Sequence, residues 1–227
     1  MIDTLLIDAD DTLLDFTLGE RTALGLAFAA HSLPFASDTH RVYHAINYKW
    51  WEKFERGEVS RADLVWHRFA DLLEHYQLSF DPAVLNASYE QNLVEQHELI
   101  AGAKEFLIKM RARYRLYVVS NGHVRTQTKR FAQSGLDRLA DGVFISEAVG
   151  YHKPQKEFFE HVAASIPHFD KDRAVLIGDS LSSDIQGGLN YGIKTILFNR
   201  EGKTIDKIRP DYVAHDWQEV ETILATL

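Results

Sequence analysis

The chain has 227 residues, of which 45% are hydrophobic, and it carries a formal net charge of −8 at pH 7. This length allows one large domain, or a core domain with an insertion, around a packed core. The negative charge argues against a nucleic acid polymer as partner. Because the chain has no cysteine, disulfides, thiolate metal sites and cysteine nucleophiles are excluded.

The sequence also gives an expectation about membranes and location. No apolar run approaches the roughly 18 residues that a bilayer-spanning helix needs, so no membrane partner is expected. The first residues lead directly into a short apolar segment and lack the basic and apolar parts of an export signal. We therefore expect a cytoplasmic protein.

The first predicted element is a buried strand in the apolar run Leu5-Leu6-Ile7. Residues 17–99 follow with little strand signal and are predicted to form about four helices. In the segment 61–77, for example, apolar side chains recur at helical spacing. Signals for helix starts stand at Ser60 and Asp81-Pro82, and a stop signal stands at Gly57.

From residue 100 onward, predicted strands alternate with predicted helices, which is typical of a parallel sheet covered on both faces. The first strand is separated from its partners by about 80 residues, too many for a loop. We therefore predict an α/β fold with a Rossmann-like parallel sheet core, residues 1–16 and 100–227, and an inserted helical domain, residues 17–99. The predicted strands are 116–119, 142–145, 174–177, 195–198 and 212–214, and the predicted helices are 124–133, 157–165, 185–191 and 218–227.

Two carboxylates, Asp8 and Asp10, follow the first predicted strand. Strands of a parallel sheet open their ligand site at their carboxyl ends. Residues two apart share a face in regular strand geometry, and neighbouring carboxylates repel unless a cation or a proton joins them. The pair suits a nucleophile or metal ligand beside a proton carrier. An acidic turn that caps a helix would also explain these residues.

Polar clusters also follow the later strands. Ser120, Asn121 and Gly122 offer a hydroxyl, an amide and backbone N–H groups at the start of a predicted helix, which suits a phosphate. An ordinary helix cap would have the same composition. Lys153 precedes a proline, which favours an extended backbone and a fixed ammonium. The alternative for Lys153 is a solvated surface lysine.

The cluster after the strand at 174–177 contains Gly178, Asp179 and Asp184. The glycine permits a tight backbone, and the two carboxylates offer the oxygen ligands that suit Mg²⁺. Asp184 would alternatively cap the helix that begins there. Four strand ends that carry an acid pair, a hydroxyl, a lysine and a second acid pair are improbable by chance.

Together these motifs resemble the haloacid dehalogenase superfamily in its phosphatase branch. The resemblance rests on the run from Asp8 to Thr12, on Ser120, on Lys153, and on Gly178-Asp179 with Asp184. The helical insertion stands where this family has a cap domain. The resemblance therefore implies a phosphoester hydrolase with a Rossmann-like core and a helical cap.

The resemblance also implies roles for individual residues. Asp8 is the nucleophile that forms an aspartyl-phosphate, and Asp10 is the general acid and base. Thr12 orients the acidic loop. The cofactor is Mg²⁺, held by Asp8, the backbone carbonyl of Asp10, Asp179 and, directly or through water, Asp184. The phosphate-binding residues are Ser120, Asn121, Gly122 and Lys153.

Within the superfamily the chain most resembles the pyrimidine 5′-nucleotidases. The likeness lies in Asp15-Phe16, the run 145–150, the run 47–51, and Arg68-Phe69. It implies a nucleoside monophosphate as the small-molecule partner. The substrate residues expected in the cap are Phe16, Asn47, Trp51 and Arg68, with Lys49, Trp50 and His67 as further candidates. Packing in a hydrophobic core would also explain the aromatic residues.

Four other functions fit parts of this pattern. They are a phosphatase for phosphoglycolate or a sugar phosphate, an enzyme like β-phosphoglucomutase, a haloacid dehalogenase proper, and a phosphoaspartate signalling receiver. A dehalogenase needs no Mg²⁺ and usually lacks the second acid, so Asp10 and Asp179 argue against it. A receiver has its phosphorylated aspartate on an internal strand of a shorter chain, whereas Asp8 follows the first strand.

Overall fold

The computed structural model describes residues 1–227. The chain divides into two compact units. One, the core unit, comprises Met1–Asp15 and His97–Leu227, and the other, the helical unit, comprises Phe16–Gln96. These divisions lie close to the boundaries expected at residues 16/17 and 99/100. Each unit has its own hydrophobic core.

The core unit is built on a six-stranded sheet in the order β3-β2-β1-β4-β5-β6, and all its neighbouring strands are parallel. This order is that of doubly wound nucleotide-binding folds, and it confirms the predicted α/β class. Every residue of β1 is buried, as expected for a central parallel strand. The strands are β1 (Thr4–Asp8), β2 (Arg115–Ser120), β3 (Gly142–Ile145), β4 (Ala174–Gly178), β5 (Lys194–Phe198) and β6 (Tyr212–Ala214).

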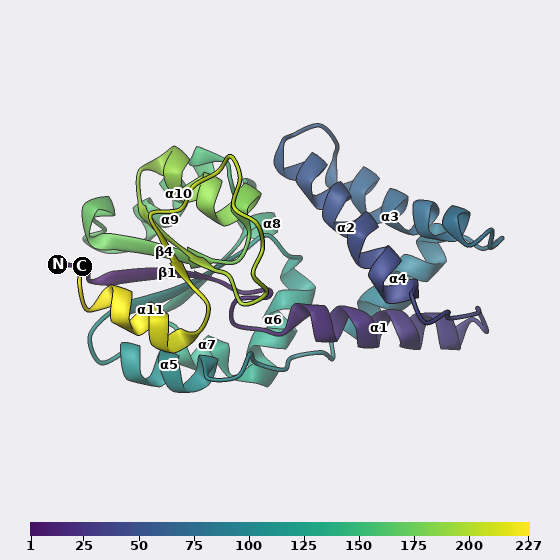
Figure 1. The fold of residues 1–227 in the computed structure, drawn as a ribbon, viewed down its shortest axis with the longest axis horizontal. Coiled ribbons are helices and arrows are strands. Elements are labelled where there is room, and N and C mark those ends of the chain that lie inside the picture. The colour runs from purple at the N-terminus through teal and green to yellow at the C-terminus, as the bar shows by residue number, and fades with distance from the viewer. The chain divides into compact units, whose positions relative to one another are not determined.

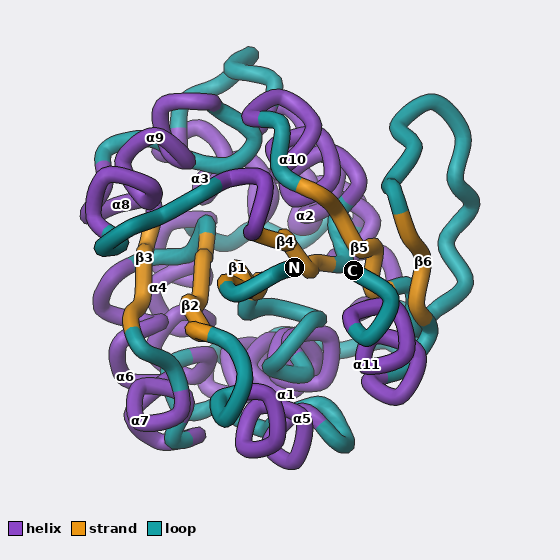
Figure 2. Tube along the Cα trace, turned by 90° about the vertical axis from the view of Figure 1, so that its left-hand side faces the viewer, coloured by secondary structure: helices purple, strands orange, loops and turns teal.

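Helices cover both faces of this sheet, as Figure 2 shows. Leu5 and Ile7 of β1 pack in one hydrophobic cluster with Phe106 and Trp217, and Leu6 packs in another with Phe158 on the opposite face. The helices are α5 (Ala103–Met110), α6 (Val124–Ser134), α7 (Leu136–Leu139), α8 (Ser146–Val149), α9 (Lys156–Ser165), α10 (Gln186–Tyr191) and α11 (Trp217–Leu224), with short helical turns η1 (Lys171–Arg173) and η2 (Leu181–Ile185).

The observed elements agree with the predicted ones at the strands and differ at several helices. The strands at 142–145 and 212–214 have the predicted bounds. The helix predicted at 185–191 starts earlier, as the π-helical turn η2, and continues as α10. The sequence analysis did not predict α5, α7 and α8. Of these, α7 and α8 have four residues each, about one turn, which is too short for a periodic pattern.

The helical unit contains four helices, as predicted, and Figure 1 shows them in the purple and blue part of the chain. Ser60 forms a capping box with Asp63 at the start of α3, and Asp81 caps α4, whose first residue is Pro82. Gly57, just after α2, has a φ of +72°, which favours glycine. The helices are α1 (Phe16–Ala30), α2 (Thr39–Glu55), α3 (Arg61–His75) and α4 (Pro82–Leu93).

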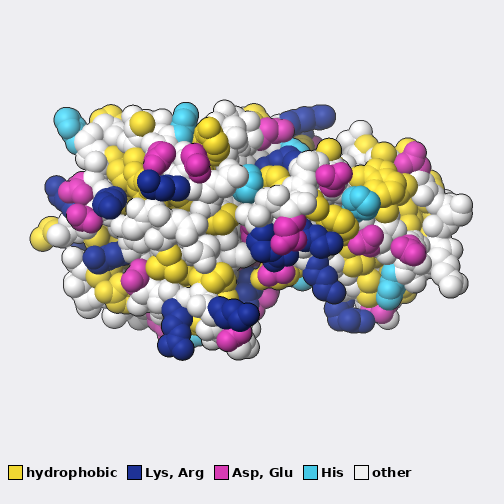
Figure 3. Space-filling model, turned by 90° about the horizontal axis from the view of Figure 1, so that it is seen from above, with side chains coloured by type: hydrophobic (Ala, Val, Ile, Leu, Met, Phe, Trp, Pro, Cys, Tyr) yellow, Lys and Arg dark blue, Asp and Glu magenta, His cyan; other side chains and the backbone are white.

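The surface carries charges of both signs side by side. On the face that Figure 3 displays, Lys and Arg side chains lie beside Asp and Glu side chains at several places. None of the helices has the length and apolar composition that a bilayer crossing requires.

Candidate active site

Three carboxylates of the core unit meet at the carboxyl ends of the neighbouring strands β1 and β4. Asp8 is the last residue of β1, Asp179 follows β4, and Asp184 lies in η2. One carboxylate oxygen of each lies within 4.8 Å of the others. A Cβ at Gly178 would stand 2.3 Å from the Asp184 carboxyl group, so only glycine permits this close approach.

Lys153 is buried between two of these carboxylates. Its Nζ donates to Oδ1 of Asp8 at 2.5 Å, to Oδ1 of Asp184 at 2.7 Å and to the carbonyl of Val119 at 3.1 Å. The side chain is 1% exposed, so the alternative of a solvated surface lysine is wrong. Asp184 also has the capping contact that the alternative expects, because its Oδ2 accepts from the N–H of Ser180 at 3.2 Å, although the N-cap position of η2 is Ser180 itself.

Asn121 fixes the backbone of Lys153. Its amide Nδ2 donates to the carbonyl of Lys153, and its Oδ1 accepts from the N–H of Lys153, both at 2.9 Å. A pair of hydrogen bonds holds the two segments in one orientation. The sequence predicts a phosphate contact from Asn121, and in the structure its side chain positions the lysine that lies beside Asp8.

The electrostatics of the cluster favour an additional cation. Burial raises the pKa of Asp8 well above its ordinary value; Lys153 opposes this, and the carboxylates of Asp184 and Asp179 add to it. Burial likewise raises the pKa of Asp179, against the effect of Lys203. Although burial alone would lower the pKa of Lys153, Asp184 and Asp8 raise it, so the ammonium stays charged.

Asp10 lies just after β1 and is held by two side chains of α6. Arg130 Nη1 donates to its Oδ1 at 2.6 Å, and Gln127 Nε2 donates to its Oδ2 at 2.7 Å. Its carboxylate therefore binds side chains rather than helix N–H groups. The sequence analysis missed Gln127 and Arg130, although their three-residue spacing would place both on one face of a predicted helix.

The Ser120 hydroxyl belongs to the same network. Its Oγ accepts from Gln127 Nε2 at 2.7 Å and from the N–H of Gly122 at 3.1 Å. The N-cap residue of α6 is His123, so Ser120 is not the helix cap. A Cβ at Gly122 would lie 2.6 Å from the Gln127 side chain. Thr12 is buried and its hydroxyl has no hydrogen-bond partner, so it does not orient the acidic loop through a hydrogen bond.

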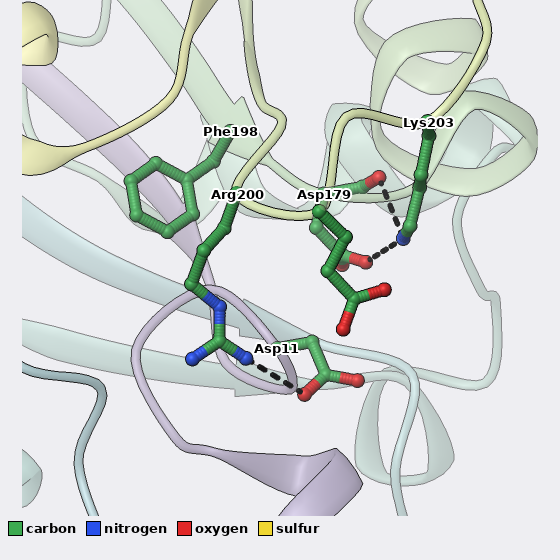
Figure 4. A pocket seen from close by; sticks show the side chains of 6 residues that line it. Asp11, Asp179, Phe198, Arg200 and Lys203 are labelled. Atoms are coloured by element: carbon green, nitrogen blue, oxygen red, sulfur yellow. Dashed lines mark hydrogen bonds and ion pairs between the residues drawn. The ribbon is translucent and has the colours of Figure 1, made fainter.

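A pocket with two further cations lies beside the carboxylates (Figure 4). Lys203 Nζ donates to Oδ2 of Asp179 at 2.6 Å, and Arg200 lies 4.0 Å from Asp11 and 3.3 Å from Asp15. Both cations follow β5, whose carboxyl end lies at the same sheet edge. The sequence analysis did not identify Arg200 and Lys203. Their position just after the strand predicted at 195–198 is the signal that could have identified them.

The donor set of the cluster fits Mg²⁺. Carboxylate oxygens are the ligands this ion prefers, and the cluster offers oxygens from Asp8, Asp179 and Asp184 close together. Burial and the neighbouring Asp184 carboxylate raise the pKa of both Asp8 and Asp179, and a bound cation would stabilise the charged form of each. These three residues would hold the ion. A bound Mg²⁺ would offset the charge of a phosphate that approaches Asp8.

We expect the substitution Lys153→Met to lower the free energy of unfolding by about 3 kcal/mol, because removal of one partner leaves buried charges unpaired. Asp8 and Asp184 would then face each other without their shared cation. Urea denaturation followed by circular dichroism measures the change. Lys156→Met is the control, since Lys156 is exposed and pairs with exposed Glu160. Equal stability of both variants would contradict the role given to Lys153.

The polar substrate candidates of the helical unit bind one another inside that unit. Asn47 and Arg68 are each 4% exposed. Asn47 Nδ2 donates to Glu20 at 3.0 Å, and Arg68 donates to Asn47 at 3.3 Å and to Asn86 at 2.7 Å. These contacts give both residues a structural role, and their contact with a substrate stays a prediction.

The aromatic candidates of the helical unit also have partners there. The Trp50 indole donates to Asp71 at 2.7 Å, and its ring stacks on His67 at 4.7 Å. Trp51 is half-buried against Phe54, with a ring distance of 5.8 Å. Phe16, also half-buried, packs against the hydrophobic core of the unit. The Trp51 ring also lies 5.7 Å from the Arg61 guanidinium, and contact of Trp51 with a substrate stays a prediction.

Comparison with known proteins points to one family. A model of haloacid dehalogenase-like hydrolases matches residues 2–192. The putative HAD-hydrolase YfnB of Bacillus subtilis is 39% identical over 97% of this chain and 94% of its own length. The pyrimidine 5′-nucleotidases PynA of Streptococcus pneumoniae and YjjG of Escherichia coli are 35% and 29% identical, over 95% and 98% of this chain and 92% and 97% of their own lengths.

Solved structures show the same fold. The crystal structure of YfnB from Bacillus subtilis bound to magnesium has a TM-score of 0.94 and 38% identity, over 98% of each chain. The L-2-haloacid dehalogenase from Xanthobacter autotrophicus has a TM-score of 0.77 and 17% identity, over 100% of each chain. The second likeness concerns the fold alone.

Proposed function

Because the chain belongs to the haloacid dehalogenase-like hydrolases, we propose that it is a Mg²⁺-dependent phosphomonoester hydrolase that acts on pyrimidine nucleoside 5′-monophosphates. The observation that carries the phosphatase proposal is the convergence of Asp8, Asp179 and Asp184 with the buried Lys153. A nucleophilic carboxylate next to a cation site suits attack on a phosphate monoester. A dehalogenase needs no Mg²⁺ and usually lacks the second acid, so Asp10 and Asp179 argue against that function.

In the proposed reaction, an oxygen of Asp8 attacks phosphorus and the ester oxygen leaves. Asp10, held by Arg130 and Gln127, enters this step as the carboxylic acid, gives its proton to that leaving oxygen and becomes a carboxylate. The same carboxylate then takes a proton from the water that hydrolyses the aspartyl-phosphate. Lys153 and the Ser120 hydroxyl bind the phosphate oxygens, and a Mg²⁺ held by Asp8, Asp179 and Asp184 would supply further charge neutralisation.

The relatives support a nucleotide as substrate. Two of them, at 35% and 29% identity over nearly the whole chain, are pyrimidine 5′-nucleotidases. A second candidate is a small-metabolite phosphatase, since a glyceraldehyde 3-phosphate phosphatase of Pyrococcus abyssi is 28% identical over 87% of this chain and 82% of its own length. The higher identity and coverage favour the nucleotidase.

A substrate panel tests the proposal. The purified enzyme with Mg²⁺ is assayed for phosphate release from UMP, dTMP, AMP, glyceraldehyde 3-phosphate, phosphoglycolate and a hexose phosphate. We expect kcat/KM for UMP or dTMP to exceed the other values by at least about tenfold, which is roughly 1.4 kcal/mol of transition-state binding. A maximum at glyceraldehyde 3-phosphate would establish the second candidate. Release of halide from a 2-haloacid without any phosphatase activity would refute both.

We expect Trp51→Ala to lower kcat/KM for UMP or dTMP by at least about tenfold and to change p-nitrophenyl phosphate hydrolysis much less. The physical reason is that a flat indole suits a pyrimidine ring, which the generic substrate lacks. Steady-state kinetics on both substrates measure the effect.

The control for this prediction is Trp66→Ala. Trp66 also lies in the helical unit, and it is 46% exposed. Equal losses of Trp51→Ala on both substrates with an unchanged melting temperature would contradict base recognition. A lowered melting temperature would assign Trp51 to packing against Phe54.

A further inference from the structure

A second group of metal-ligating side chains lies within the helical unit. It consists of Glu20 on α1 and of His40 and His44 on α2. One ligand atom of each lies within 4.8 Å of the others. The histidines are four residues apart, so successive turns of one helix present both imidazoles on the same face.

The distances between these atoms suit a small cation. Oε2 of Glu20 lies 2.8 Å from Nδ1 of His44 and 3.4 Å from Nε2 of His40. Two ligand atoms about 2.1 Å from Zn²⁺ at a tetrahedral angle lie about 3.4 Å apart. The atoms of Glu20 and His40 already have this separation, and those of Glu20 and His44 need to move apart by about half an ångström. The two histidine nitrogens lie within 4.8 Å of each other.

Two observations distinguish the group from an ordinary ion pair. The Glu20 side chain is fully buried, and a buried carboxylate is costly without strong compensation. Nε2 of His40 is a buried atom 3.4 Å from Oε2 of Glu20, and this contact is too long and poorly aligned to be a good hydrogen bond. Buried ring nitrogens are normally hydrogen-bonded or bound to a metal. A metal ion held by this group would give Nε2 of His40 that partner.

Surrounding residues orient the carboxylate as in metal sites. Asn47 Nδ2 donates to Oε1, the second carboxylate oxygen of Glu20, at 3.0 Å. Arg68 in turn donates to Oδ1 of Asn47 at 3.3 Å. Hydrogen bonds to the outer oxygen of a ligand are the usual means of fixing its direction. The side chain of His44 is 41% exposed, which gives an ion and a water a way in.

We propose that Glu20, His40 and His44 form a metal site for Zn²⁺ or a similar divalent transition ion, with a water as fourth ligand. Two imidazoles and one carboxylate suit such ions better than Mg²⁺, which prefers oxygen ligands only. The ion cross-links α1 to α2 and neutralises Glu20. The site is independent of the proposed phosphatase reaction.

Zinc titration of the full chain tests this proposal. Metal-free protein is first saturated with Mg²⁺, so that the oxygen ligands of the core unit are occupied, and is then titrated with Zn²⁺ by calorimetry. We expect one Zn²⁺ per chain that excess Mg²⁺ does not displace. His40→Ala and His44→Ala should each weaken its affinity by at least about tenfold. The control His75→Ala, an exposed histidine of the same unit, should leave the affinity unchanged.

A second measurement keeps the two metal sites apart. Co²⁺ in the four-coordinate tetrahedral site proposed here would absorb visible light more strongly than six-coordinate Co²⁺ among carboxylates and water. The absorption should persist in Asp179→Asn and disappear in His44→Ala, and circular dichroism checks that each variant keeps its fold. Absence of Zn²⁺ binding in the presence of Mg²⁺, or equal affinity in the two histidine variants and the wild type, would overturn the proposal.

Discussion

Asp8→Asn is expected to reduce phosphate release at least about a thousandfold, equivalent to about 4 kcal/mol of activation free energy, while the fold persists. An amide of the same shape has no charged oxygen with which to attack phosphorus. The substitution removes one of three crowded carboxylates and leaves Lys153 paired with Asp184, so a large loss of stability is not expected. Steady-state kinetics and thermal melting of the purified variant measure the two effects.

Two further measurements make this result specific to covalent catalysis. Wild-type enzyme mixed with substrate and quenched in acid should carry a phosphoryl group on the peptide that contains Asp8, and Asp8→Asn should carry none. The control Asp137→Asn changes a carboxylate that is 42% exposed in α7 and should keep full activity. Activity of Asp8→Asn above about a thousandth of the wild-type value would refute the nucleophile assignment.

The sheet is predictable from sequence because its signals are local. Buried parallel strands are continuous apolar runs, and their polar ends mark one edge of the sheet. The sequence alone therefore assigns Asp8, Ser120, Lys153 and Asp179 to that edge, and each ends or follows a strand of the core unit. This placement does not give the role of each residue in a reaction. The variants described above test those roles.

The partners of these residues are not predictable in the same way. Gln127 and Arg130 are polar residues in a helix, which normally indicates a solvent-facing surface. Their burial and their contacts with Asp10 depend on how α6 packs against the sheet. Lys203 is likewise a charged loop residue, which the sequence does not distinguish from a solvent-exposed lysine. Its contact with Asp179 appears only in the folded structure.

The helical unit shows the opposite difficulty. The resemblance of the run 47–51 and of Arg68-Phe69 to the pyrimidine 5′-nucleotidases implies Asn47 and Arg68 as substrate contacts. In the structure they form a buried chain of hydrogen bonds that ends on Glu20. Glu20 itself gives no sequence signal, since a single glutamate in an amphipathic helix is most often solvated. Its two histidine partners are separated from it by the rest of α1 and a loop.

Removal of metal ions with EDTA is expected to abolish hydrolysis of every phosphate ester, and excess Mg²⁺ is expected to restore it. The physical reason is the charge balance beside Asp8: three carboxylates lie within 4.8 Å, and the lysines paired with them are Lys153 and Lys203. A phosphate dianion that approaches this cluster is repelled unless a divalent cation offsets its charge.

Mg²⁺ should also raise the melting temperature of the metal-free protein, because it binds the folded state. EDTA already saturated with Mg²⁺ is the control. Asp179→Asn should require a higher Mg²⁺ concentration for half-maximal activity, whereas full activity after exhaustive chelation would exclude the proposed metal dependence.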